Sequence, residues 1–520
     1  MIGRIFTVGG LTLVSRITGF ARDIVLAAIL GAGPLADAFF VALRLPNHFR
    51  AIFAEGAFNA AFIPAYARLN TTGGKQVAGV FADRIFTLLF VTQLVLLAIA
   101  LAFTPTVIGW LAPGFARDPE RFALAVELTR ITFPYLLLVS LVTLYGGILN
   151  ALGRFASAAA APILLNLSMM AALALAAFFP TAGHAAAWGV FAAGCLEVLL
   201  LATDVTRRGA LPAFRWPRFD EEIRYFLKRF APATIGAAET QIALFADTII
   251  ASFLAVGALS ALYYADRLNQ LPIGVIGIAV GTVLLPEMAN RLAAGDETGA
   301  RRAQMRAIEL TLLLSIPCVV AFLLIPELIM RAMFARGAFS AADAAVAGAT
   351  LRAYAIGLFP FVLMRSAATT FLSRGDTWTP VKALFFAVLV NVALKILLYD
   401  QHAQVGLALA TSIGGWVNLM LLTWFAMRAR LFTVESELAR SIARLAIAGA
   451  VLAVVLALAI RPVGALFAGW SAMRDIASLA MLAVIGAVTY GGAIWLLFGR
   501  EWLARYRRAA LPDRSDASGS

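Results

Sequence analysis

The stretch GFARDIVLAAILGAGPLADAFFVALRLPNHFRAIFAEGAF, residues 19–58, joins two apolar runs through a short turn and carries charges inside both. Its charged side chains include Arg22, Asp23, Asp37 and Arg44. Placing such a charge at bilayer depth costs several kcal/mol unless it faces water or a partner. Two helices that keep these charges are therefore expected to line a hydrated cavity or to hold ion pairs.

The composition indicates an all-α, polytopic membrane protein. Of the 520 residues, 62% are hydrophobic and 14% are charged, whereas soluble domains are about half apolar and about a quarter charged. The net charge is +13, but the basic residues are scattered between apolar spans, which disfavours nucleic-acid binding. Cys195 and Cys318 lie in apolar stretches and the three histidines are far apart. No disulfide, metal site or cofactor is expected.

Fourteen stretches are long enough to cross a bilayer, since each crossing needs about 20 apolar residues. An even number of crossings places both termini on the same side. The predicted spans are 5–30, 35–65, 79–110, 120–150, 157–179, 184–205, 223–254, 259–290, 300–333, 342–372, 379–398, 404–427, 438–460 and 474–498.

The charges of the loops predict the orientation. Alternate loops are rich in arginine and lysine, whereas GAGP, PTAGHA, AVGALS and YDQHAQ on the opposite side contain neither. Because basic loops stay in the cytoplasm, both termini are expected to be cytoplasmic. The exceptions, which fall on the outer side, are Arg117, Arg121, Arg331, Arg336, Arg461 and Arg474.

An internal repeat predicts two similar lobes. FARDIVLAAILGAGPLADAFF (20–40) resembles FADTIIASFLAVGALSALYY (245–264), and ordered matches continue downstream at a nearly constant offset. Six crossings separate the copies, so the repeat is parallel, as in two-lobed transporters that hold substrate between rocking lobes. The predicted organisation is an N-lobe over 1–215, a C-lobe over 216–430, two more helices over 431–500 and a cytoplasmic tail over 501–520.

Arginines outnumber acids at the candidate cavity positions, which favours an anionic substrate. Guanidinium groups bind phosphate oxygens in pairs, so a phosphate-bearing solute is the natural choice. The alternative is that the charges form structural ion pairs, such as Arg16 with Asp37, or extend to the membrane surface.

Four motifs together resemble the MurJ (MviN) family of bacterial lipid II flippases, in the multidrug/oligosaccharidyl-lipid/polysaccharide exporter superfamily. They are SRITGFARD (15–23), ADAFFVALRLPN (36–47), FAEGAF (53–58) and YYADRL (263–268). The resemblance implies a flippase, not an enzyme, that moves undecaprenyl pyrophosphate carrying a disaccharide-pentapeptide across the bacterial inner membrane for peptidoglycan synthesis. It also implies a lipid-tail groove formed by the last two helices, which are almost free of charge. The two-lobed organisation predicts alternating access, and the chain is expected to act as a monomer.

The resemblance further implies the site residues. Asp37, Arg44, His48 and Glu55 share one helical stripe, so spacing favours Arg44 over Arg50, whereas the motif favours Arg50. The expected pyrophosphate-binding residues are Arg16, Arg22, Arg50 and Arg267. The expected ion-pairing and gating residues are Asp23, Asp37, Glu55 and Asp266.

One position departs from the pattern of relatives that hold a sodium ion. The matching residues here are Asp247, Asn391, Lys395 and Thr411, and Lys395 stands where the relatives have an acid. An ammonium beside Asp247 takes the place of the cation, so we expect this cation site to be degenerate and the chain to have no sodium site.

Other functions fit less well. A sister exporter of another polyprenyl-linked oligosaccharide or of drugs is the nearest alternative, although the extra helix pair argues against a drug exporter. A polyprenyl-phosphate glycosyltransferase needs a sizeable catalytic loop, and the loops here are short. A channel does not account for two similar lobes.

Overall fold

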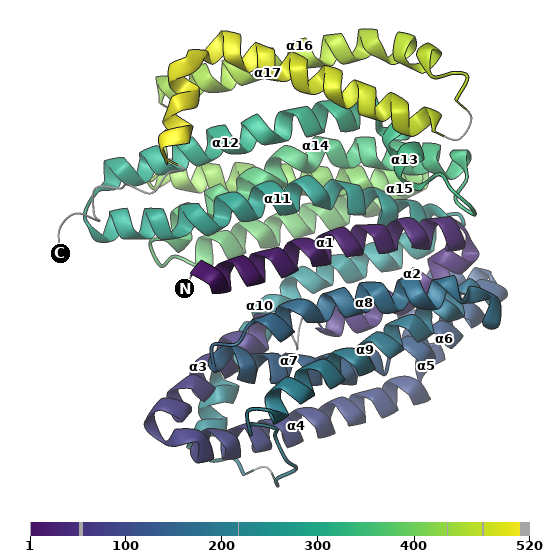
Figure 1. Ribbon diagram of the computed structural model, residues 1–520, viewed down its shortest axis with the longest axis vertical. Coiled ribbons are helices and arrows are strands. Elements are labelled where there is room, and N and C mark those ends of the chain that lie inside the picture. Colours follow the sequence, from purple (N-terminus) through teal and green to yellow (C-terminus); the bar gives the residue numbers. More distant parts are fainter. Residues whose placement is uncertain (1, 51–55, 217, 434, 471–472, 510–520) are drawn as a thin grey trace. The chain divides into compact units, whose positions relative to one another are not determined.

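The structure is a computed structural model that describes the chain except for residues 1, 51–55, 217, 434, 471–472 and 510–520 (Figure 1). The described residues are almost entirely helical and contain no strand, which confirms the predicted all-α class. Contacts divide the chain into two units. The first comprises Met1–Tyr264, Phe334–Asp343 and Ile396–Leu407, and the second comprises Ala265–Met333, Ala344–Lys395 and Ala408–Ser520.

The helices of the N-terminal part are short to medium in length. They are α1 (Ile2–Leu30), α2 (Pro34–Arg50), α3 (Gly56–Thr72), α4 (Gly74–Ala102), α5 (Thr104–Leu111), α6 (Pro119–Thr132), α7 (Tyr135–Ala151), α8 (Ala156–Ala174), α9 (Ala182–Thr206) and α10 (Glu221–Ser252), with short 3-10 turns at Pro113–Arg117 and Ala176–Phe178.

The later helices have 28 or more residues, except for the nine-residue α13. They are α11 (Ala258–Ala293), α12 (Glu297–Leu324), α13 (Pro326–Phe334), α14 (Ala341–Leu372), α15 (Trp378–Arg428), α16 (Ser436–Leu466) and α17 (Arg474–Ala509).

Nine helical stretches among the described residues are long and apolar enough to cross a bilayer, so the chain is a multi-pass membrane protein. One of the nine combines α6 and α7 across residues 133–134. Neither α1 nor α2 is among the nine. Along its length α1 carries Arg16, Arg22 and Asp23, and α2 has only 17 residues.

Several predicted spans are interrupted. The described part of the predicted span 35–65 is divided between α2 and α3. The predicted span 79–110 ends as α4 at Ala102 and continues as α5, which has a proline in its first turn. In the same way α12 ends just before Pro326, which begins α13. Proline lacks the N–H that would continue the preceding helix, so it favours a new start.

The longest helix contains a break. Ala403 in α15 has φ 45° and ψ −132°, which is not helical. It divides α15 into two segments that match the predicted spans 379–398 and 404–427. An additional methyl group on Gly414 would lie 2.9 Å from the Cβ atom of Asn391, so the two segments pack closely there.

Aromatic side chains form the core where α3, α4 and α10 meet in the first unit. The ring of Phe62 stacks on Phe58 and on Phe81, with centroids 5.1 and 5.7 Å apart. Phe226 of α10 meets Phe58 edge-on at 5.7 Å. Such pairs add about 1 kcal/mol each beyond simple burial, and they hold α3 and α4 against α10.

The last two helices run side by side in the second unit (Figure 1). The hydroxyl of Tyr490 in α17 donates to the carbonyl oxygen of Leu313 in α12 at 2.9 Å. Their outer faces are apolar and exposed, as at Leu458, Val488 and Leu496. Exposed apolar faces along long helices are typical of surfaces that contact lipid.

Candidate functional site

The predicted site residues on α1 form a buried polar cluster. Arg22 is 8% exposed and Asp23 is 3% exposed. The Arg22 guanidinium donates to Oδ1 of Asp23 at 2.7 and 3.1 Å and to Oδ1 of Asn166 at 3.1 Å. A buried charge is tolerated when it is paired and hydrogen-bonded, and both conditions are met here.

Asn166 on α8 holds this cluster in place. Its amide nitrogen donates to the carbonyl oxygen of Ser15 at 3.0 Å and to the hydroxyl of Thr18 at 3.1 Å. A methyl group on Gly19 would lie 3.4 Å from the same amide nitrogen. A small residue at position 19 therefore lets α8 approach α1 and fixes the orientation of the Arg22 guanidinium.

Tyr263, at the start of α11, connects this cluster to α2. Its hydroxyl donates to Oδ1 of Asp23 at 3.2 Å. Its ring stacks on Phe40 of α2, with centroids 3.8 Å apart. One aromatic side chain thus touches both α1 and α2, the two helices of the stretch 19–58.

Asp37, in the first turn of α2, lies at the centre of a second buried cluster and is 0% exposed. Its carboxylate accepts hydrogen bonds from the guanidinium of Arg121 and from the backbone N–H of Gly257 and of Ser260, each at 2.8 Å. The hydroxyl of Ser260 also donates to it. The Arg121 guanidinium lies 3.8 Å from the ring centroid of Phe115, a favourable cation–π contact.

Turns with glycine place these groups. Gly31 ends α1 with φ +67°, and Gly257 precedes α11 with φ +87°, a region that glycine enters at little cost. A methyl group on Gly257 would lie 2.8 Å from the carbonyl oxygen of Ala32. The close approach of these two turns brings the N–H groups at the start of α11 to Asp37.

A third segment packs on the end of α1. The N–H of Ala338 donates to the carbonyl oxygen of Ala28 at 2.7 Å. Gly337, with φ +57°, passes so close that a methyl group there would lie 2.2 Å from the same oxygen. Phe334 meets Phe20 of α1 at 6.0 Å between centroids. Residues 334–339 therefore pack on the end of α1, next to the turn that joins α1 to α2.

The second half of α2 carries polar contacts to α10. The guanidinium of Arg44 donates to the hydroxyl of Thr248 at 2.7 Å. His48 is buried, and its Nδ1 lies 2.7 Å from Oε1 of Gln241. Arg44 and His48 thus lie along one stripe of α2, as the predicted helical spacing requires.

Arg50, the last residue of α2, is half-buried. Its charge interacts favourably with Glu197 of α9, a buried acid whose carboxylate also accepts a hydrogen bond from the hydroxyl of Tyr135 at 3.4 Å. Arg44 and Arg50 therefore face different partners, on α10 and α9 respectively.

The remaining predicted residues differ in their surroundings. Arg16 is exposed on α1. In the second unit Asp266 and Arg267 are half-buried on α11, where Gln270 donates to Asp266 at 3.4 Å. Glu55 lies outside the described residues.

The residues of the predicted cation site lie on two helices. Asp247 is half-buried on α10 in the first unit. Asn391 and Lys395 are four residues apart on α15 and so share a face, and Lys395 is 1% exposed. Thr411 follows the break at Ala403.

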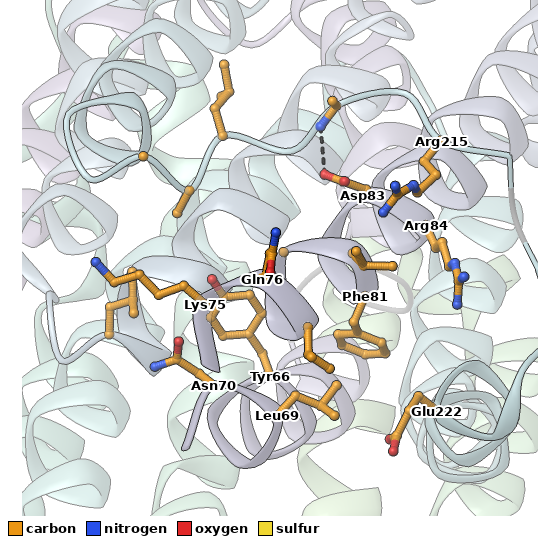
Figure 2. A pocket seen from close by; sticks show the side chains of 18 of the residues that line it. Tyr66, Leu69, Asn70, Lys75, Gln76, Phe81, Asp83, Arg84, Arg215 and Glu222 are labelled. Atoms are coloured by element: carbon orange, nitrogen blue, oxygen red, sulfur yellow. Dashed lines mark hydrogen bonds between the residues drawn. The ribbon is translucent and has the colours of Figure 1, made fainter. Parts of the chain in front are cut away.

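A cavity of about 640 Å³ lies in the first unit, away from these clusters, where the α3–α4 connection meets residues 208–222. Figure 2 shows Asp83 at its edge, where the carboxylate accepts a hydrogen bond from the backbone N–H of Ala213 at 2.8 Å. Asp220 pairs with Arg84. No predicted site residue lines this cavity.

Sequence patterns did not identify four of the partner residues: Arg121, Glu197, Gln241 and Thr248. Arg121 had one signal, since it was among the few basic residues that were predicted to lie on the outer side. The alternative pairing of Arg16 with Asp37 is not the one observed, because Asp37 pairs with Arg121 while Arg16 is exposed.

Known proteins match this chain over most of its length. The family model described as "Lipid II flippase MurJ" matches residues 26–486. A protein of Rhizobium tropici named "Probable lipid II flippase MurJ" is 39% identical over 531 residues, covering 100% of this chain and 99% of the relative.

Two solved structures share the fold. The chain resembles "Lipid II flippase MurJ, inward closed conformation" with a TM-score of 0.80 and 23% identity, covering 95% of this chain and 99% of that one. It also resembles an inward-facing multidrug resistance MATE family transporter of the MOP superfamily, with a TM-score of 0.69, 16% identity and coverage of 80% and 95%.

Proposed function

Because the chain belongs to the MurJ family of lipid II flippases, we propose that it carries lipid II from the cytoplasmic to the outer leaflet of the bacterial inner membrane. The observation that carries the assignment is the match of the family model over residues 26–486. Its cargo is undecaprenyl pyrophosphate bearing a disaccharide-pentapeptide, which is needed for peptidoglycan synthesis. It acts as a transporter and not as an enzyme.

The proposed topology has fourteen spans, with both termini in the cytoplasm. Two six-helix lobes, 1–215 and 216–430, alternate in access around the cargo, and residues 431–500 supply a groove for the lipid tail. The apolar outer faces of α16 and α17 support the groove, because a C55 tail must remain in an apolar environment. We propose that the chain works as a monomer.

Arg16, Arg22, Arg50 and Arg267 form the proposed pyrophosphate site. Asp23 and Asn166 hold the guanidinium of Arg22 in position. A guanidinium already held in position loses little entropy when it binds a phosphate. Arg16 is exposed, so its guanidinium can contact the pyrophosphate before the buried Arg22 does.

Asp37 is the proposed gate. Its carboxylate joins α2 and α6 to the start of α11 through four hydrogen bonds. In the predicted orientation this contact closes the outer side, and opening outward requires these bonds to break. Asp23 and Tyr263 form a second contact between α1 and α11, while Glu55 and Asp266 are proposed to contribute further ion pairs.

Lys395 is proposed to replace a sodium ion. A buried ammonium supplies a permanent positive charge at the position where relatives bind the cation. Its burial on the same face as Asn391 supports this role, because a buried lysine must be balanced by polar or anionic groups.

The experiment is complementation in cells whose own lipid II flippase can be depleted. The wild-type chain should restore growth, and Arg267→Glu should not, because it reverses a charge in the pyrophosphate site. Arg224→Glu, an exposed position near the start of α10, is the matched control and should grow. Normal growth of Arg267→Glu, with equal membrane levels, contradicts the assignment of this site.

If the wild type also fails to complement although it reaches the membrane, another polyprenyl-linked oligosaccharide becomes the better cargo.

A further inference from the structure

Four arginines of the second unit converge on one pocket. The pocket has a volume of about 510 Å³ and is lined by the end of α12, the start of α13 and α17, the middle of α14 and the end of α16. Arg331, Arg352, Arg461 and Arg474 line it, together with only two acids, Glu327 and Asp475.

The acids are committed to a single arginine. The guanidinium of Arg331 lies 3.2 Å from the carboxylate of Glu327 and 3.3 Å from that of Asp475. The three other arginines are exposed. Within the part of the chain that the structure describes, no carboxylate pairs with them. The pocket therefore carries an excess of positive charge, and like charges around one pocket repel unless an anion binds.

The position of these arginines is unusual for a membrane protein. Three of the four, Arg331, Arg461 and Arg474, are exceptions to the predicted rule that basic residues stay on the cytoplasmic side. Arg461, near the end of α16, and Arg474, the first residue of α17, flank one connection, and Arg331 of α13 meets them at the same pocket. Basic residues from two separate regions of the chain thus line one pocket, and their combined charge favours an anionic ligand.

Apolar side chains form part of the wall of the pocket. Leu324, Ile325 and Leu328 come from the junction of α12 and α13, and Ile460 and Leu482 come from α16 and α17. Guanidinium groups beside an apolar wall at a helix end match a lipid, whose phosphate lies at the membrane surface and whose chains lie deeper.

We propose that this pocket binds the phosphate of an anionic lipid headgroup in the outer leaflet. Arg461 and Arg474 hold the phosphate oxygens, Arg352 adds positive charge, and Arg331 is fixed by Glu327 and Asp475 as part of the wall. None of these residues belongs to the proposed pyrophosphate site for the cargo, so lipid binding here is separate from flipping. The assignment to the outer leaflet rests on the predicted orientation.

Binding can be measured by native mass spectrometry of the purified full chain with added phosphatidylglycerol. The double variant Arg461→Gln/Arg474→Gln should bind about tenfold more weakly, because it removes two charge-assisted contacts. The matched control, Arg302→Gln/Arg440→Gln, removes the same charge from a different pocket of the second unit and should bind as the wild type does. Equal losses in both double variants, or no loss in either, overturn the proposal.

Three further probes identify the source of the phosphate. Zwitterionic phosphatidylethanolamine should bind less well than phosphatidylglycerol. Undecaprenyl pyrophosphate competing for the same arginines would name a polyprenyl lipid as the occupant, which is still a lipid phosphate. Inorganic pyrophosphate binding as tightly as either lipid overturns the proposal, because the apolar wall would then contribute nothing. If the double variant does not fold, the single variant Arg352→Gln takes its place, with a smaller loss expected.

Discussion

The carboxylate of Asp37 lies 2.8 Å from the guanidinium of Arg121, and both side chains are buried. The pair joins the first turn of α2 to the first turn of α6, and the same carboxylate accepts the N–H groups of Gly257 and Ser260. The contact therefore ties together segments that are far apart in the sequence, which is what a gate requires.

Removing one member of this pair should be costly. Asp37→Asn leaves the Arg121 charge buried without its carboxylate, so we expect unfolding to become easier by about 3–5 kcal/mol and flipping to be lost. Thermal unfolding in detergent measures the first effect and complementation the second. In the double variant Asp37→Asn/Arg121→Gln no charge is left unpaired, and part of the stability should return while flipping stays low. An unchanged unfolding temperature for Asp37→Asn would mean that the pair does not hold these helices.

Arg16 and Arg22 should respond differently to truncation. Arg16→Ala removes an exposed side chain, so flipping should fall while the unfolding free energy stays within about 0.5 kcal/mol of wild type. Arg22→Ala removes the buried ion pair with Asp23 and the hydrogen bond to Asn166, so it should lower both. Measuring unfolding temperature and flipping on the same preparations separates the two. A large stability loss in Arg16→Ala would show that Arg16 has a structural role.

Gly337 should tolerate no side chain. Its φ of +57° is unfavourable for alanine, and the methyl group would lie 2.2 Å from the carbonyl oxygen of Ala28. Gly337→Ala should therefore destabilise the protein by at least about 1–2 kcal/mol. Gly33→Ala, in the same region but with no atom within 4 Å of its added methyl, is the control and should be neutral. Equal unfolding temperatures for the two variants would show that residues 334–339 do not pack on α1.

Sodium should not drive transport. If Lys395 permanently replaces the cation, exchanging sodium for choline at a fixed membrane potential should leave lipid II flipping unchanged. Lys395→Asp restores the acid of the relatives and is the variant most apt to gain a response to sodium. A wild-type activity that falls when sodium is removed contradicts the prediction.

The orientation can be tested with single cysteines after Cys195 and Cys318 are replaced by serine. Thr72, the last residue of α3, and Gly469, between α16 and α17, are both exposed. The variants Thr72→Cys and Gly469→Cys are expected to place their cysteines on opposite sides of the membrane. A membrane-impermeant maleimide added to intact cells should label position 469 and not position 72. The opposite pattern reverses the topology, and with it the leaflet proposed for the arginine pocket.

The sequence was most informative where one residue type has one physical consequence. Apolar length predicted the long helices, but the predicted span 300–333 runs through the interruption before α13, which the proline at position 326 explains. The two segments of α15 matched predicted spans because the short polar connection around Ala403 breaks the apolar run. The division of α4 from α5 was missed, since the apolar pattern continues through Ala102 and Thr104.

Partners between distant segments were harder to predict. The stripe on α2 correctly grouped Arg44 with His48, but nothing in helical spacing identifies Thr248 or Gln241 as their partners. Asp37 was recognised as important, whereas its partner Arg121 follows from the packing of α6 and not from any motif. A helical pattern tells which face a residue occupies, and only tertiary packing tells what that face meets.

The most direct test of the central claim is the amount of lipid II that a membrane-impermeant reagent reaches from outside cells depleted of their own flippase. Cells expressing the wild-type chain should expose lipid II, and cells expressing Arg267→Ala at the same membrane level should not. Exposure that is equal in both strains would contradict the arginine site. Exposure in neither would contradict lipid II as the cargo.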